Sequence, residues 1–222
     1  MKTLSFLILS LIIIVVSELQ GQNKYDFNWI LGHDISLLVP GGDAVLLDFN
    51  KNPLGISKIH PPDSFWMDGT NTSMSDKDGN LLFYTNGCYI INSNHELMEN
   101  GDTLSPGYAQ DAHCDLLGYP MPQSAISLPV PGSDSLYYLF NLDLDFAYWG
   151  TQYFGIAPLH LFYHTIDMSE NDGLGAVVAK YQVAVEDTLA RGTLQATRHY
   201  NEEDWWVIIP ESHSNCYYIM LV

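Results

Sequence analysis

The chain has 222 residues, and its 26 aspartates and glutamates against 8 lysines and arginines give a formal net charge of -18 at pH 7. This negative charge repels phosphate backbones and anionic lipid surfaces, so it excludes nucleic acid as a partner. The composition is 47% hydrophobic, which is typical of a globular protein that buries a core and not of a disordered chain.

The N-terminal segment is typical of a secretory signal. Lys2 precedes an apolar run over residues 4–16, and a polar stretch then ends near Gly21. The run is shorter than the about 20 apolar residues of a membrane span. We therefore expect residues 1–21 to be a cleaved signal peptide and residues 22–222 to be a secreted or cell-surface domain without a membrane span. A retained anchor and a cleavage after Ser17 remain as alternatives.

The rest of the sequence predicts short strands, aromatic and β-branched, separated by clusters of Asp, Gly, Asn and Pro. Three stretches share one layout: a strand, a polar turn, a stronger aromatic strand, a turn and a third strand. The expected strands lie at residues 70–75, 81–85 and 89–91, then 124–130, 136–140 and 159–166, and finally 194–199, 205–209 and 216–222. No long amphipathic helix is expected.

The central strand of each unit is almost wholly apolar, so it needs a neighbouring sheet on both faces. Blades of a β-propeller meet this need by stacking around a channel, with about four to eight blades in a ring. We therefore predict an all-β chain that supplies about three blades of an incomplete propeller, with a further contribution from residues 44–49. A β-sandwich is the alternative fold. Because the last expected strand reaches Val222, we expect the remaining blades to follow it.

Several motifs, in order along the mature chain, resemble those of secreted β-propeller proteins of Bacteroidetes. They are NWILG (28–32), SDKDGNLLFYTNG (75–87), NSNHELMENGDTL (92–104), YPMPQSAISLPVPGSDSLYYLF (119–140), IDMSENDGLGAVV (166–178) and the closing segment 196–222. The resemblance implies the N-terminal propeller region of a type IX secretion cargo, followed in that family by further blades and a C-terminal sorting domain. It also implies an extracellular location, in a family mostly without assigned biochemistry.

One polar turn resembles the start of a calcium-binding loop. Asp76, Asp78 and Asn80 alternate around Gly79. An EF-hand places glycine sixth and glutamate twelfth, whereas here Gly79 is fourth and Gly87 is twelfth. We interpret the segment as a hairpin turn in which Asp-Gly supplies positive φ angles. Ca²⁺ is the one cofactor hypothesis that the sequence leaves open.

Three cysteines, Cys88, Cys114 and Cys216, form no CxxC pair and no zinc-like spacing. In an oxidising compartment Cys88 and Cys114 would bridge across an easily closed loop and leave Cys216 free or paired with a cysteine outside this sequence. The alternative is three small apolar residues packed in strands or loops.

An insertion over residues 143–158 is rich in aromatic and acidic side chains. Ordered loops on a rigid scaffold usually carry function, so we expect a ligand site there. Exposed aromatic rings stack on sugars or protein loops, and two alternating carboxylates at a strand end would share a cation or a proton. The candidates are Tyr148, Trp149, Tyr153, Asp143 and Asp145.

The sequence contains no GxSxG elbow, no HExxH and no glycine-rich phosphate loop. A sialidase site clamps its carboxylate with three arginines, and only Arg191 and Arg198 are present. His160 and His164 lie four apart on an expected strand, about 13 Å from each other, which is too far for a shared metal. We favour a non-enzymatic binding or scaffold module for an extracellular glycan or protein. The alternative is an extracellular, glycosidase-like hydrolase with carboxylates on blade loops.

Overall fold

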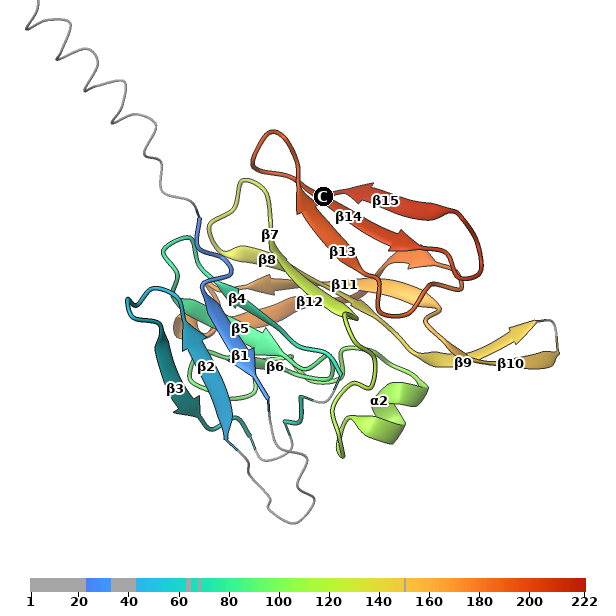
Figure 1. The fold of residues 1–222 in the computed structure, drawn as a ribbon, viewed down its shortest axis with the longest axis horizontal. Helices are drawn as coiled ribbons and strands as arrows, with labels where there is room; N and C mark the ends of the chain where they lie inside the picture. Colours follow the sequence, from blue (N-terminus) through green and yellow to red (C-terminus); the bar gives the residue numbers. More distant parts are fainter. Residues whose placement is uncertain (1–22, 33–42, 63–64, 68, 150) are drawn as a thin grey trace, which may run out of the picture.

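The computed structural model describes residues 23–32, 43–62, 65–67, 69–149 and 151–222, with the side chains of Trp149, Tyr153 and Phe154 left out. The predicted signal peptide, residues 1–21, lies outside these ranges. The described chain is built of antiparallel sheets with two short helical segments (Figure 1). The predicted all-β class is therefore confirmed.

The described strands form four meander sheets and one separate hairpin. The first sheet contains β1 (Asn28–Leu31), β2 (Ala44–Asp48) and β3 (Gly55–Ile59), and the second contains β4 (Thr72–Ser75), β5 (Leu81–Thr85) and β6 (Ile90–Asn92). The third contains β7 (Ala125–Pro129), β8 (Leu136–Leu142), β11 (His160–Asp167) and β12 (Ala176–Glu186). The fourth contains β13 (Gln195–Arg198), β14 (Trp205–Pro210) and β15 (Tyr217–Leu221). The hairpin is β9 (Asp145–Trp149) with β10 (Gln152–Ala157), and the helical segments are α2 (Tyr108–His113) and the 3-10 helix η1 (Asn171–Gly173).

The sequence predicted the nine strands of the three repeated units, and each has a counterpart in β4–β8, β11 and β13–β15. The expected strand at residues 44–49 is β2, but it is the middle of a full sheet whose flanking strands β1 and β3 were not expected. The long β12 was also missed, because its sequence mixes valines and alanines with Lys180 and Gln182 and lacks the dense apolar character of the central strands.

Successive sheets stack face to face, which explains why the central strands are apolar on both sides. In β5, Tyr84 packs toward the first sheet and Phe83 toward the third, and both are fully buried. In β8, Leu139 packs toward the second sheet and Phe140 toward the fourth. Burying a large side chain of this kind contributes roughly 1.5–3 kcal/mol. The stacking therefore follows directly from the alternation of side chains along each central strand.

The first strands of the sheets meet on one side of the molecule. β1 contacts β4, and β4 contacts β7. Figure 1 shows the four described sheets following one another from the blue N-terminal sheet to the red C-terminal sheet without closing on themselves. Among the residues that the structure describes, no helix has the length and apolar character needed to cross a membrane.

Candidate functional site

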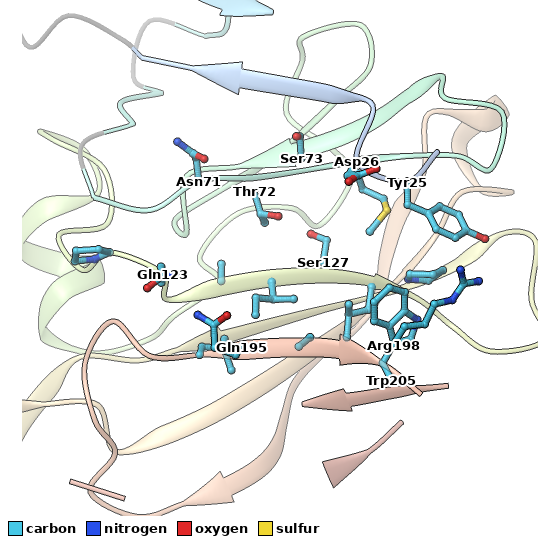
Figure 2. Close-up of a pocket in the computed structure, with 18 of the residues that line it drawn as sticks. Tyr25, Asp26, Asn71, Thr72, Ser73, Gln123, Ser127, Gln195, Arg198 and Trp205 are labelled. Carbon is cyan, nitrogen blue, oxygen red and sulfur yellow. The ribbon is translucent and has the colours of Figure 1, made fainter. Parts of the chain in front are cut away.

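A groove of about 720 Å³ runs along the first strands of the sheets. Its walls come from β4, β7 and β13, with Trp205 of β14 and the segment before β1 at one end. Figure 2 shows Thr72 of β4 and Ser127 of β7 pointing toward one another across the groove. Two smaller hollows, of about 260 and 300 Å³, share lining residues with it.

The groove is polar because each of these first strands is a sheet edge. β4, β7 and β13 pair with a neighbouring strand on one side only, so backbone N–H and C=O groups remain on the other side. Hydroxyl and amide side chains add to this set of donors and acceptors. They are Asn71, Thr72, Ser73, Gln123, Ser127 and Gln195.

The groove is close to electrically neutral. Of the side chains that line it, Asp26 and Arg198 are the charged ones, and their charges cancel. This balance contrasts with the net charge of -18 of the whole chain. A neutral wall in an acidic protein neither concentrates cations nor selects an anion, so it favours an uncharged ligand that forms many hydrogen bonds.

One end of the groove is aromatic. The guanidinium carbon of Arg198 lies 5.9 Å from the centre of the Trp205 ring, a cation–π arrangement. Tyr25 lies beside this pair in Figure 2, whereas Asn71, Gln123 and Gln195 lie toward the opposite end. The groove therefore combines a stacking surface at one end with amide groups at the other.

Two polar atoms on the lining residues have no hydrogen-bond partner within the described part of the chain. They are the hydroxyl of Ser127 and the indole N–H of Trp205, and both are shielded from solvent. An unsatisfied buried polar group costs roughly 1–3 kcal/mol. A ligand hydroxyl that formed a hydrogen bond with either atom would offset part of this free-energy cost.

A buried hydrogen-bond cluster joins the segments that lead into β4 and β7. The Thr70 hydroxyl lies 2.6 Å from the Ser124 hydroxyl and also bonds to the backbone carbonyl of Met121. Thr70 and Ser124 are each 1% exposed. This cluster fixes the spacing of β4 and β7, and so the width of the groove between them.

The predicted aromatic site lies elsewhere, on the β9–β10 hairpin, which projects from the stacked sheets (Figure 1). Tyr148 is 61% exposed and pairs in register with Tyr153 across the hairpin. The side chains of Trp149 and Tyr153 lie outside the described part of the chain. The hairpin and the groove are therefore separate candidate surfaces, and of the predicted residues whose side chains the structure describes, Asp143, Asp145 and Tyr148, none lines the groove.

The predicted carboxylates hold the base of this hairpin. Asp143 is 2% exposed, and its carboxylate accepts hydrogen bonds from the backbone N–H groups of Leu159 and His160 at 2.6 and 2.8 Å. The His160 ring nitrogen Nδ1 lies 2.6 Å from its other oxygen. Asp145 lies 3.4 Å from the backbone N–H of Tyr108 in α2. The partner of Asp143 is thus an imidazole and two amides, not a second carboxylate.

The Asp-Gly turn closes on itself. The Asp76 carboxylate accepts hydrogen bonds from the backbone N–H groups of Asp78 and Asn80 at 2.9 and 2.8 Å and from the Asn80 side chain at 2.8 Å. Gly79 has φ 93, and its carbonyl accepts a bond from Asn28 at 2.7 Å, which ties the turn to the first sheet. Both Asp76 oxygens are therefore used by the turn, as the hairpin interpretation expects.

Within the described ranges, no group of three or more His, Cys, Asp or Glu side chains is arranged to hold a metal ion. The Ca²⁺ hypothesis for the turn stays a prediction.

Cys88 and Cys114 form a disulfide with a Cα–Cα distance of 5.6 Å, and Cys216 is free and exposed. Both bridged cysteines are buried in the cluster between the third and fourth sheets. The disulfide links the loop after β5 to the end of α2. Neither cysteine lines the groove, so we interpret the disulfide as part of the scaffold.

Sequence reasoning missed the groove residues. The signal that would have found them is the polarity of the first strand in each repeated unit, where Thr72, Ser127 and Gln195 replace the apolar residues of the central strands.

Comparisons with protein-family models, with curated proteins and with solved structures found no match to the chain. The groove is therefore interpreted from its own chemistry.

Proposed function

We propose that the chain is an extracellular, non-enzymatic binding module whose four sheets are consecutive blades of a β-propeller. The groove along their first strands binds a neutral oligosaccharide. The propeller assignment is supported by the face-to-face stacking of meander sheets and by the first strands meeting at one groove. The extracellular assignment is supported by the secretory character of residues 1–21 and by the disulfide.

The observation that carries the choice of ligand is the neutral, hydrogen-bonding wall of the groove. Sugar hydroxyls are uncharged donors and acceptors, which suits strand edges that offer both kinds of group. The C–H face of a sugar ring also stacks on aromatic rings, and Tyr25 and Trp205 supply them at one end. A charged ligand would be attracted by one of the two charged side chains, Asp26 and Arg198, and repelled by the other, so its charge would add little to the affinity.

The test is calorimetric binding of the secreted protein to a panel of neutral oligosaccharides. Gln195→Ala removes an exposed amide of the groove, and we expect it to weaken binding about 5–10-fold, the effect of one neutral hydrogen bond. Gln182→Ala, an exposed amide on the outer strand β12, is the matched control and leaves binding unchanged.

Two further measurements separate the alternatives. Tyr148→Ala on the hairpin keeps full affinity if the groove is the site, and loses it if the hairpin is the site. Mass spectrometry of the oligosaccharides after prolonged incubation detects hydrolysis, and product formed by the wild-type protein would overturn the non-enzymatic assignment. Absence of binding to every neutral oligosaccharide of the panel would overturn the choice of ligand.

A further inference from the structure

Three exposed carboxamide side chains lie at the end of the groove opposite the aromatic pair. Asn71 directly precedes β4, Gln123 lies two residues before β7, and Gln195 is the first residue of β13. They occupy matching places, at the start of the first strand, in three successive sheets. Figure 2 shows all three at this end, whereas the charged Asp26 and Arg198 lie toward the other end. We call these three side chains the amide end.

The amide end is available to a ligand. Within the described part of the chain, none of its three side chains forms a hydrogen bond to another protein group. Each carboxamide offers one carbonyl acceptor and two N–H donors. A sugar hydroxyl is both a donor and an acceptor, so one carboxamide can bond to two adjacent hydroxyls of the same ring at once.

Gln123 has a backbone conformation that most side chains avoid. Its φ is 47, in the left-handed region that favours glycine and, among other residues, asparagine. Of the nine non-glycine residues with positive φ in the described ranges, Gln123 is the one that lines the groove. Strained backbone of this kind clusters at ligand sites, where it holds a side chain in position. We therefore interpret the conformation of Gln123 as one that directs its carboxamide toward the ligand.

The two ends of the groove contribute to binding in different ways. Stacking on Tyr25 and Trp205 uses the C–H face of a sugar ring, which most sugars possess, so it adds affinity with little selectivity. Hydrogen bonds depend on the direction of each hydroxyl, and a site built to bond a hydroxyl discriminates strongly against a ligand that does not present it. Selectivity among neutral sugars is therefore expected at the amide end.

We propose that the amide end selects among neutral oligosaccharides by the orientation of two adjacent hydroxyl groups on one sugar ring, and that Gln123 is its main specificity-determining residue. This inference rests on the oligosaccharide binding proposed above. The preferred ligand carries an unsubstituted pair of adjacent hydroxyls at the amide end, and its next ring or rings extend along the groove toward Trp205.

The test is calorimetric binding of the secreted protein to cellotetraose, mannotetraose and galactotetraose, which are neutral and whose sugars differ in the orientation of single oxygens. We expect the wild type to prefer one of them at least about 10-fold, the effect of one or two neutral hydrogen bonds. Gln123→Gly should reduce this preference to less than about 3-fold, while the weaker binding by the aromatic end remains. Gln123→Asn keeps a carboxamide and tolerates the left-handed backbone, so it should retain part of the preference.

Two controls separate ligand recognition from folding. Glycine suits a positive φ, so the urea midpoint of Gln123→Gly should not fall below that of the wild type, and its lost preference is then not lost folding. Asn171→Gly also removes an exposed carboxamide at a positive φ, but on η1 and outside the groove, and it keeps both affinity and preference.

The outcomes distinguish this inference from the function on which it rests. Equal wild-type affinity for the three tetrasaccharides, binding to none of them, or a preference that survives in Gln123→Gly overturns the inference. The proposed function still stands in each case if another neutral oligosaccharide binds in the groove. Binding to no neutral oligosaccharide at all overturns the proposed function itself.

Discussion

His164 makes the free energy of unfolding depend on pH. It does so at higher pH than the range in which the aspartates of the protein take up protons. It lies in β11 with 0% exposure, its Nε2 is 2.7 Å from the Asn141 side-chain oxygen, and its ring packs edge-on against Tyr181. Its Nδ1 is buried without a hydrogen-bond partner in the described part of the chain. Burial, and then the nearby charge of Lys180, lowers the pKa of His164 from 6.5 to about 4.

The sign of the effect follows from the protons bound in each state. Between pH 6.5 and about 4 the unfolded chain holds a proton on His164 that the folded chain does not, because the folded pKa is the lower one. The free energy of unfolding therefore falls as the pH falls through this window. At about 1.4 kcal/mol for each unit, we expect a loss of about 2 kcal/mol at pH 5 and about 3 kcal/mol near pH 4.

The assay is urea denaturation of the wild type and of His164→Gln at pH values from about 7.5 to about 5. This range starts above the ordinary pKa of histidine and ends above the lowered pKa of His164. The variant is less stable at neutral pH because its packing is poorer, but its stability changes less with pH. The aspartates with lowered pKa, such as Asp43 and Asp102, lose their contribution only below their ordinary value of 3.8, so they do not obscure this window. Gln182→Ala, at an exposed side chain of β12 that does not titrate, is the control and keeps the wild-type slope. Parallel curves for the wild type and His164→Gln would refute the reasoning.

Three further predictions concern the scaffold. Asp76→Ala removes the acceptor of three hydrogen bonds in the turn and should lower the free energy of unfolding by about 1–2 kcal/mol; a Ca²⁺-dependent rise in melting temperature, present in the wild type and lost in this variant, would support a calcium site instead. Replacing Cys88 and Cys114 by alanine opens a loop with a sequence separation of 26 and should cost about 3–4 kcal/mol in denaturant unfolding, and an unchanged midpoint would contradict this. Asp143→Ala leaves two backbone N–H groups unpaired at the base of the β9–β10 hairpin, so limited proteolysis within residues 145–157 should accelerate at least several-fold; equal cleavage rates would show that Asp143 does not hold the hairpin.

The sequence predicted those parts of the fold that depend on local signals. The central strands β5, β8 and β14 were placed within one or two residues of their ends, because a dense apolar run between polar turns indicates a strand covered on both faces. The Asp-Gly turn before β5 was also expected for a local reason, since the hydrogen bonds that the Asp76 carboxylate accepts join residues at most four apart.

The groove depends on contacts between distant segments, which no local signal reports. Thr72, Ser127 and Gln195 come from three different sheets, and each strand alone is a short polar edge. The insertion at residues 143–158 drew attention because of its aromatic residues, but the structure uses its acid Asp143 to anchor a hairpin. A candidate site was therefore easier to nominate from the sequence on an aromatic loop than on the inner edges of repeated sheets.

The neutrality of the groove predicts how ligand binding depends on salt. The charges of Asp26 and Arg198 cancel there, in a chain with a net charge of -18. Salt screens charge interactions over a Debye length of about 8 Å at physiological ionic strength. If the groove binds a neutral oligosaccharide, as we propose, the affinity should therefore stay constant over a salt series. An affinity that falls as salt rises would mean that the ligand is charged and that Asp26 or Arg198 contributes to its binding.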